Sequence, residues 1–170
     1  MFENQSSYNS IYFKKTISKF TTGISIIILQ DKENIPIGLT INSFNSVSLQ
    51  PPIILWSLNK NSYHFSKIVK SKLYTIHILS SNQINLALKF SKGNNKERFI
   101  DLPLKKTKFG TILLNVPVLA WFECESHNSI KIGDHIVLFA KIINCRYFNK
   151  KPLIFYNGQF NLCKNNYKLN

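Results

Sequence analysis

The alternation of apolar and polar residues along the chain predicts a fold rich in β-strands. Residues 24–29 form a mainly β-branched apolar run, which is typical of a buried strand. From Ile35 to Ile41 every second residue is isoleucine or leucine, so one face of this strand is expected to pack on a core. Similar runs predict further strands over residues 53–58, 73–79, 118–124, 135–143, 153–156 and 159–162.

Three short segments have the periodicity of helices instead. The first places Phe13, Ile17 and Phe20 at i, i+4 and i+7, with lysines at other positions. The polar, mixed stretch from residue 93 to 106 has no such period and is expected to be a loop. The predicted helices cover residues 7–22, 62–71 and 83–90.

The order of these elements favours a mainly β fold with a few helices. Strands follow one another as hairpins, and no βαβ rhythm is present. This pattern favours a closed antiparallel barrel with the helices packed outside it. With 170 residues, the whole of 1–170 is expected to form one domain.

The segment from Pro36 to Pro52 is the most informative part of the chain. Its strand alternation breaks at Asn42-Ser43, where short hydroxyl and amide side chains gather. It contains no His, Cys, Lys, Asp or Glu, and therefore no acid, base or nucleophile. A surface with many donors and acceptors but no reactive group suits a ligand that brings its own chemistry. We therefore predict a cofactor cradle here.

The cysteines and the apolar runs bear on the compartment. Cys124, Cys145 and Cys163 are an odd number and lie far apart, which favours a reducing cytoplasm over a disulfide framework. The longest apolar run is too short to span a bilayer, and the polar N-terminus lacks the apolar region of a signal peptide. We therefore expect a cytoplasmic protein that does not enter a membrane.

The net charge of +14 raises the question of nucleic-acid binding. Nearly all of the positive charge is lysine, since Arg98 and Arg146 are the only arginines, and the lysines are dispersed rather than gathered in a stripe. Nucleic-acid readers usually depend on arginine and on a concentrated basic patch. The composition therefore favours a solvated surface in a Lys/Asn/Ile-rich chain over a nucleic-acid footprint, and it remains compatible with an anionic small molecule.

The segment Ser57–Ser62 lies between a predicted strand and a predicted helix. Such a turn offers backbone N–H groups to a phosphate, and Lys60 with the hydroxyls of Ser57 and Ser62 would add to them. An ordinary helix capped by Asn61 or Ser62 is the alternative. With the cradle one strand earlier, the two interpretations are comparable.

Among the histidines, His135 has the most suggestive context. Gly133-Asp134 predicts a tight turn that would project its imidazole at a defined angle, so functional and structural roles are equally supported. His64 and His77 have no such context and are assigned structural roles. Cys124 and His127 form a C-x-x-H pair, but a zinc site needs four ligands, and no metal site is expected.

Several segments, taken in order, resemble the flavin reductase family of the FMN-binding split-barrel fold. Each segment alone is a weak match, but together they form a specific one that spans nearly the whole chain. The matching segments are residues 19–24, 38–49, 51–52, 119–124, 133–139 and 152–160.

This resemblance implies a split antiparallel β-barrel and an NAD(P)H-dependent reductase that transfers hydride to FMN or FAD. It also implies a homodimer, with the flavin in a groove near the subunit interface and His135 beside the nicotinamide of NADH or NADPH. An Arg-Phe pair of the family matches Arg98-Phe99. The residues expected at the flavin are Gly38, Thr40, Ile41, Asn42, Ser43 and Phe44 along the isoalloxazine, Ser57, Leu58, Asn59, Lys60, Asn61 and Ser62 at the ribityl phosphate, and Phe90 and Ser91 near the phosphate end or the adenosine.

Two departures from the family pattern leave a second hypothesis open. Ala140-Lys141-Ile142 stands where the family usually has Gly-Glu-Val, and Phe90-Ser91-Lys92-Gly93 replaces Phe-Ala-Gly. A flavin-binding electron carrier with weak turnover is therefore the alternative to a reductase, and a basic nucleic-acid-binding barrel is a third. For a reductase, the expected partner is an oxygenase that consumes reduced flavin.

Overall fold

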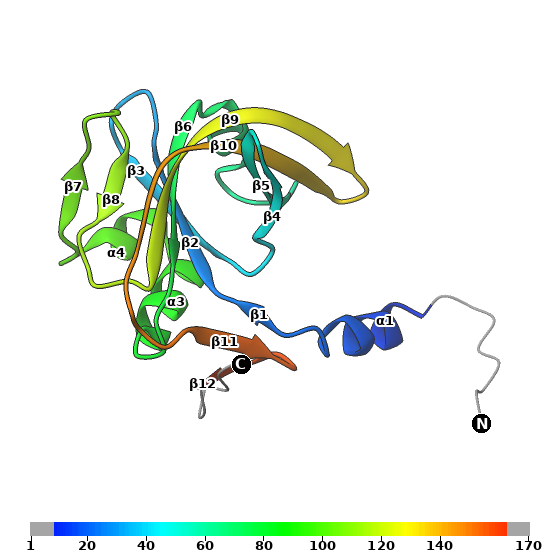
Figure 1. The fold of residues 1–170 in the computed structure, drawn as a ribbon. Helices are drawn as coiled ribbons and strands as arrows, with labels where there is room; N and C mark the ends of the chain where they lie inside the picture. Colours follow the sequence, from blue (N-terminus) through cyan, green and yellow to red (C-terminus); the bar gives the residue numbers. More distant parts are fainter. Residues whose placement is uncertain (1–8, 163–170) are drawn as a thin grey trace.

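The computed structural model describes residues 9–162, and strands dominate this range (Figure 1). The helices are α1 (Ser10–Ile17), α2 (Phe65–Lys70), α3 (Ile84–Ser91) and α4 (Asn95–Phe99). The strands are β1 (Thr22–Gly23), β2 (Ser25–Gln30), β3 (Pro36–Ile41), β4 (Asn45–Leu49), β5 (Pro52–Asn59), β6 (Leu73–Ile78), β7 (Leu104–Lys106), β8 (Ile112–Leu114), β9 (Ala120–Ile132), β10 (His135–Tyr147), β11 (Leu153–Tyr156) and β12 (Gln159–Leu162).

The main sheet has seven strands in the order β3-β2-β6-β9-β10-β5-β4. Every pair in it is antiparallel, and the sheet curls into a barrel (Figure 1). Its two end strands, β3 and β4, follow one another in the chain but do not pair. The predicted split antiparallel barrel is therefore confirmed, and the opening between β3 and β4 replaces the closed barrel expected from the strand pattern alone. Smaller sheets join β1-β11-β12 and β7-β8.

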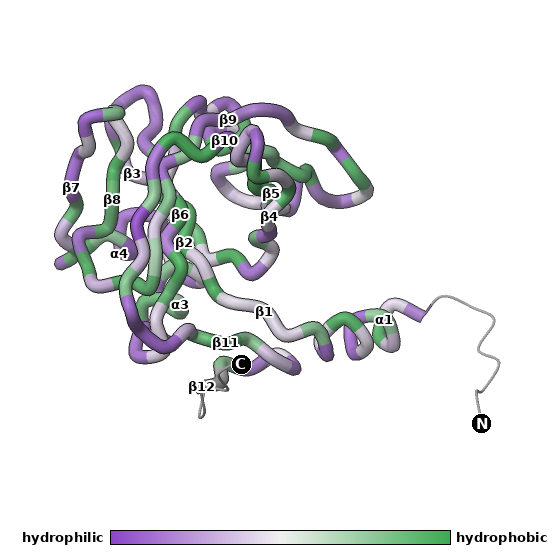
Figure 2. The backbone as a smooth tube through the Cα atoms, in the orientation of Figure 1, coloured by the Kyte–Doolittle hydropathy of each residue, from purple (hydrophilic) through white to green (hydrophobic). Residues whose placement is uncertain are grey.

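Residues 26–29 of β2 are all apolar because both faces of the strand are covered. Ile27 and Leu29 belong to the core inside the barrel, whereas Ile26 and Ile28 belong to a second core under α3. Figure 2 shows β2 and β6 as hydrophobic strands at the centre of the molecule. The chain therefore builds two cores on the two sides of one strand.

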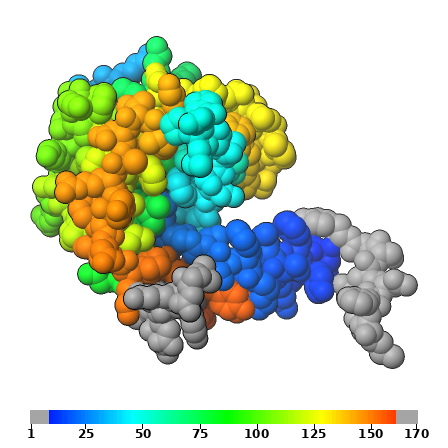
Figure 3. All heavy atoms as spheres, in the orientation of Figure 1, coloured from blue at the N-terminus to red at the C-terminus, as the bar shows by residue number. Residues whose placement is uncertain are grey.

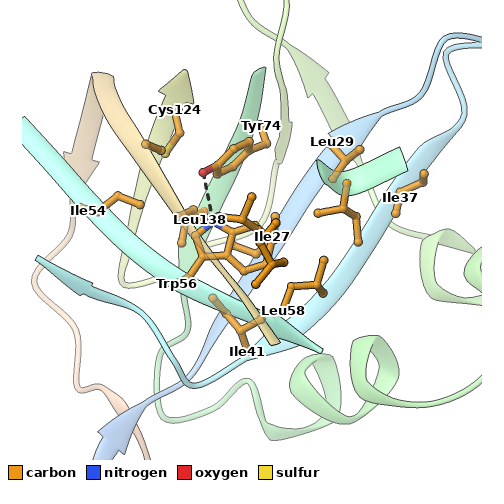
Figure 4. Close-up of a cluster of buried hydrophobic side chains, with 14 residues drawn as sticks. Ile27, Leu29, Ile37, Ile41, Ile54, Trp56, Leu58, Tyr74, Cys124 and Leu138 are labelled. Atoms are coloured by element: carbon orange, nitrogen blue, oxygen red, sulfur yellow. Dashed lines mark hydrogen bonds between the residues drawn. The ribbon is translucent and has the colours of Figure 1, made fainter. Parts of the chain in front are cut away.

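The core inside the barrel is centred on Trp56 of β5 (Figure 4). Its indole N–H donates to the Tyr74 hydroxyl at 3.0 Å, and the two rings meet edge to face at 5.8 Å. Both side chains are buried, so each satisfies the only polar group that the other brings into the core. Burial raises the pKa of Tyr74, which keeps its hydroxyl protonated.

Helix α1 differs from its prediction in length and in surroundings. Residues 7 and 8 of the predicted helix lie outside the described residues, and α1 ends at Ile17 because Ser18 and the next residues form a turn. None of its residues is buried, and Figure 3 shows it projecting from the rounded body. Ile11 and Ile17 are 65% and 55% exposed. An apolar helix face without a core beside it is left for another surface to cover.

Several further differences separate the fold from its prediction, among them the unpredicted strand β8 and the greater length of β9 and β10. The prediction of a loop over residues 93–106 is wrong, because this stretch contains α4 and β7. Residues 45–49 form the edge strand β4, where no strand was predicted. Pro52 was predicted only to end a segment, but it is the first residue of β5 and pairs with Leu49. Helix α2 begins at Phe65, three residues later than predicted.

The described residues contain no helix that is long and apolar enough to cross a membrane. Within the same residues, no group of three or more His, Cys, Asp or Glu side chains is placed to hold a metal ion. Cys124 is a buried and Cys145 an exposed free thiol, and Cys163 lies outside the described range.

The buried His77 makes the fold sensitive to acid. Its Nε2 accepts the Leu114 N–H at 3.0 Å, and burial lowers the pKa of the imidazole from 6.5 to about 4. As the pH falls, the imidazole of His77 takes up a proton near pH 6.5 in the unfolded chain but only near pH 4 in the folded chain. Stability is therefore complete above pH 6.5 and falls as the pH drops through this window.

We predict that His77→Gln, which keeps an acceptor for Leu114 but does not titrate, will show a weaker dependence of stability on pH. Between pH 7 and pH 5 the wild type should lose about 2 kcal/mol more unfolding free energy than the variant. Urea unfolding at both values measures this difference. Equal losses in both proteins would contradict the assignment.

Candidate functional site

A groove of about 960 Å³ lies where β3, the start of α2, the end of α3 and α4 meet. It brings together residues from all three segments of the predicted flavin site that precede His135. The predicted site residues in its wall are Gly38, Thr40, Ser62, Phe90 and Ser91.

The β3 wall of the groove depends on the close packing of α3 and α4 behind Gly38. A Cβ at this position would lie 2.6 Å from Cδ1 of Phe90 and 2.9 Å from Cζ of Phe99. These two rings meet edge to face at 5.2 Å, and Phe90 is almost fully buried. Two residues further along β3, on the same face, the Thr40 hydroxyl donates to the Ala87 carbonyl at 2.7 Å. Glycine therefore lets a helix lie directly against the strand.

Side chains of α4 take the place of a neighbouring strand at the edge of β3. Asn95 donates to the Pro36 carbonyl at 2.6 Å and accepts the Gly38 N–H at 3.3 Å. Arg98 donates to the Gly38 carbonyl at 2.6 Å and to two carbonyls of the preceding loop. Partial burial lowers the pKa of Arg98, which remains charged. Part of the exposed edge of β3 is thereby satisfied without a neighbouring strand.

Positive groups predominate along the groove. Lys67, Lys96 and Arg98 line it, and the single carboxylate in its wall, Glu97, accepts a hydrogen bond from Asn94. Lys67 is paired with Asp31 at 2.6 Å. Burial lowers the pKa of His64 in the same wall, and the charges of Lys67 and Arg98 lower it further. The groove therefore favours an anion.

The other predicted cradle residues, 41–44, do not line the groove, and three of them pack on the barrel. The Ser43 hydroxyl accepts the Ser57 N–H at 3.0 Å and donates to the Ser57 carbonyl at 3.1 Å, which ties the cradle to β5. Phe44 stacks on Phe122 with ring centroids 5.6 Å apart. The barrel core holds the side chain of Ile41, whereas Asn42 is exposed.

The predicted phosphate turn is a tight reversal rather than a helix N-terminus. Asn59 Oδ1 accepts the Asn61 N–H at 2.8 Å, and the Ser62 N–H donates to the Asn59 carbonyl at 3.0 Å. Leu58 is buried in the barrel. The N-cap of α2 is His64, so neither Asn61 nor Ser62 caps the helix. Of this turn, Ser62 reaches the groove.

His135 lies outside the groove wall but next to the turn. It opens β10 opposite Asn59 of β5, and its Nδ1 lies 2.8 Å from Oδ1 of Asp134. That hydrogen bond lowers the pKa of Asp134. The imidazole is 42% exposed, so it is accessible to a ligand that extends beyond the groove.

Comparison with known proteins identifies the family. The model of the flavin reductase like domain matches residues 17–163, most of the chain. The chain belongs to the flavin reductase family.

Its similarity to individual members extends over most of the sequence. The FMN reductase (NADH) SmoA of Agrobacterium fabrum is 35% identical over 89% of this chain and 85% of its own. The reductase component of flavin-dependent trigonelline monooxygenase from Acinetobacter baylyi is 29% identical over 86% of this chain, which spans only 47% of that relative. The solved structure of the styrene monooxygenase flavin reductase from Pseudomonas putida S12 is 27% identical, with a TM-score of 0.79 over 93% of this chain and 99% of that one.

The groove of this flavin reductase family member fits a flavin by its own chemistry. Its volume is at the upper end of the range for small-molecule sites, about 300–1,000 Å³. Its lining includes hydroxyl side chains, residues of β3 and cationic side chains. A flavin nucleotide needs both polar and cationic groups, because it joins a ring with a polar rim to a phosphate.

Sequence reasoning missed part of the groove wall. Asn95 and Lys96 fell within the predicted loop, although the sequence carries a capping signal, Asn94 three residues before Glu97. In the structure Asn94 caps α4 and accepts the Glu97 N–H at 3.0 Å. Tyr63 and Lys67 carried no signal of their own. His64, assigned a structural role, also lines the groove.

We predict that Gly38→Ala will destabilise the protein, because the added methyl group must displace the rings of Phe90 and Phe99. The unfolding free energy should fall by about 1–3 kcal/mol, as is usual for overpacking. Gly23→Ala is the matched control, since a Cβ there meets nothing within 4 Å. Urea unfolding measures both, and equal stability of the two variants would contradict the packing role of Gly38.

Proposed function

We propose that this protein is an NAD(P)H:flavin oxidoreductase that binds FMN or FAD in the groove between β3, α2, α3 and α4. The observation that carries the proposal is that three separate parts of the predicted flavin site meet in one cation-lined groove. Membership of the flavin reductase family supports the same activity. The name of its relative SmoA, an NADH-dependent FMN reductase, agrees with it.

Each part of the site has a proposed role. The segment from Thr40 to Phe44 lies along the isoalloxazine, and the Ser62 hydroxyl donates to the phosphate. Phe90 and Ser91 lie next to the phosphate end of the flavin nucleotide or next to its adenosine. His135, whose Nδ1 is hydrogen-bonded to Asp134, directs Nε2 toward the carboxamide of the nicotinamide.

The bound flavin supplies the redox chemistry, because its ring accepts a hydride from the nicotinamide and passes the electrons on. The protein contributes orientation and exclusion of water. Accordingly, the cradle residues from Gly38 to Phe44 include no acid, base or nucleophile. Rate then depends on how closely the two rings are held together.

The proposed partner is an oxygenase that consumes reduced flavin. The trigonelline and styrene relatives carry the names of monooxygenase reductases, which supports this proposal. The cytoplasm is the proposed compartment, since an odd number of dispersed cysteines suits a reducing environment.

A homodimer is the proposed assembly, with α1 in the interface. Ile11 and Ile17 of α1, and Phe20 just after it, are 65%, 55% and 68% exposed, so the rest of the described chain leaves these apolar side chains uncovered. A second copy that covers this helix would remove the surface from water.

The activity is tested by anaerobic oxidation of NADH and NADPH with FMN or FAD added. We expect loss of the nicotinamide absorbance to require both flavin and protein with at least one nucleotide pair. Heat-denatured protein is the control. A protein that turns yellow with flavin but oxidises neither nucleotide would identify the electron carrier instead.

The assembly is tested by Ile17→Lys, with Lys15→Gln as a control at an exposed polar position on the other side of the same helix. Light scattering should give the wild type and the control twice the mass of one chain. Burial of an unpaired ammonium costs more than about 1.4 kcal/mol, so Ile17→Lys should weaken the dimer at least about tenfold. A monomeric wild type would contradict the proposal.

A further inference from the structure

Two turns of the barrel lie against each other at the end of β5. Asn59 and His135 are the last paired residues of β5 and β10. Beyond them, the Lys60 N–H donates to the Asp134 carbonyl at 2.9 Å and continues the ladder into the turn. The predicted phosphate turn and the turn that carries His135 are therefore joined by the backbone.

The side chain of Lys60 strengthens the same junction. Its Nζ donates to the Gly133 carbonyl at 2.5 Å, so one residue binds two successive carbonyls of the Gly133-Asp134 turn. Gly133 has φ +54°, the left-handed conformation that this turn requires. The ammonium is thus directed to the turn before His135, and Lys60 does not line the groove.

His135 needs such support because its own partner is on the surface. The Asp134 side chain is 82% exposed, and an exposed ion pair contributes little to holding a geometry. The backbone of the turn must therefore fix where Asp134 and His135 point. Among the described contacts, the two bonds from Lys60 hold that backbone from the β5 side.

We propose that Lys60 is a positioning residue for His135 and not a ligand of the flavin phosphate. This inference rests on the proposed reductase function, in which His135 orients the nicotinamide. The sequence led us to expect Lys60 at the flavin phosphate, whereas in the structure its ammonium binds the turn before His135. Loss of the ammonium should loosen the turn, and with it the placement of the nicotinamide, but leave flavin binding intact.

The test compares Lys60→Met with Lys60→Arg and with Lys150→Met. Lys150 is the matched control, because its Nζ holds the Pro117 carbonyl at 2.6 Å away from the groove. For Lys60→Met we expect kcat/KM for the reduced nicotinamide to fall about tenfold, mainly through KM, since misplacement by a fraction of an ångström has such effects. Lys60→Arg should restore most of the loss, and Lys150→Met should resemble the wild type.

Flavin affinity separates the two roles of Lys60. The Kd for FMN, measured by fluorescence quenching, should change less than about twofold in Lys60→Met, whereas loss of a phosphate ligand would raise it about tenfold. Riboflavin, which lacks the phosphate, is the companion ligand. A rise in Kd for FMN but not for riboflavin, with an unchanged KM for the nicotinamide, would overturn the proposal.

A measurement without flavin keeps this inference separate from the proposed function. In ¹⁵N spectra of the imidazole in the flavin-free protein, Lys60→Met should shift or broaden the His135 Nδ1 signal, and Lys60→Arg should restore it. An unchanged signal in Lys60→Met would overturn the positioning role. Absence of nicotinamide oxidation in the wild type would instead contradict the reductase activity itself.

Discussion

The pairing of β10 with both β9 and β5 determines how the barrel closes and where His135 lies. Through it the hairpin of β9 and β10 closes the far side of the barrel around Trp56. The same register places His135 opposite Asn59. A shift by one residue would turn every side chain of β10 to the other face, so core packing and the position of His135 are specified together.

The opposite side of the barrel is organised by the gap between β3 and β4. An end strand exposes a row of backbone groups, and here α4 satisfies part of that row through Asn95 and Arg98. Because the covering element is a helix and not a strand, cationic and amide side chains border the groove beside it. The opening in the sheet is therefore bordered by cationic side chains, where we propose that the flavin phosphate binds.

Local patterns in the sequence predicted most strands of the barrel and part of the groove wall. The alternation in β3 placed Gly38 and Thr40 on the face opposite Ile37, where α3 packs in the structure. Helix α4 was missed because its packed face depends on few apolar residues, Phe99 among them, and its polar contacts are with the distant strand β3. The contact of Lys60 with Gly133 links residues 73 apart and leaves no trace in either segment. Such pairings are set by the sheet, so a local pattern cannot show them.

Backbone ¹H–¹⁵N spectra recorded while FMN is added test whether the groove beside β3 holds the flavin. We expect the amides of Gly38–Ser43, Ser62 and Ser91 to shift together with a single Kd, while those of the β7–β8 hairpin do not shift. Shifts confined to residues outside the groove, or no shifts with FMN or FAD, would contradict this placement of the flavin.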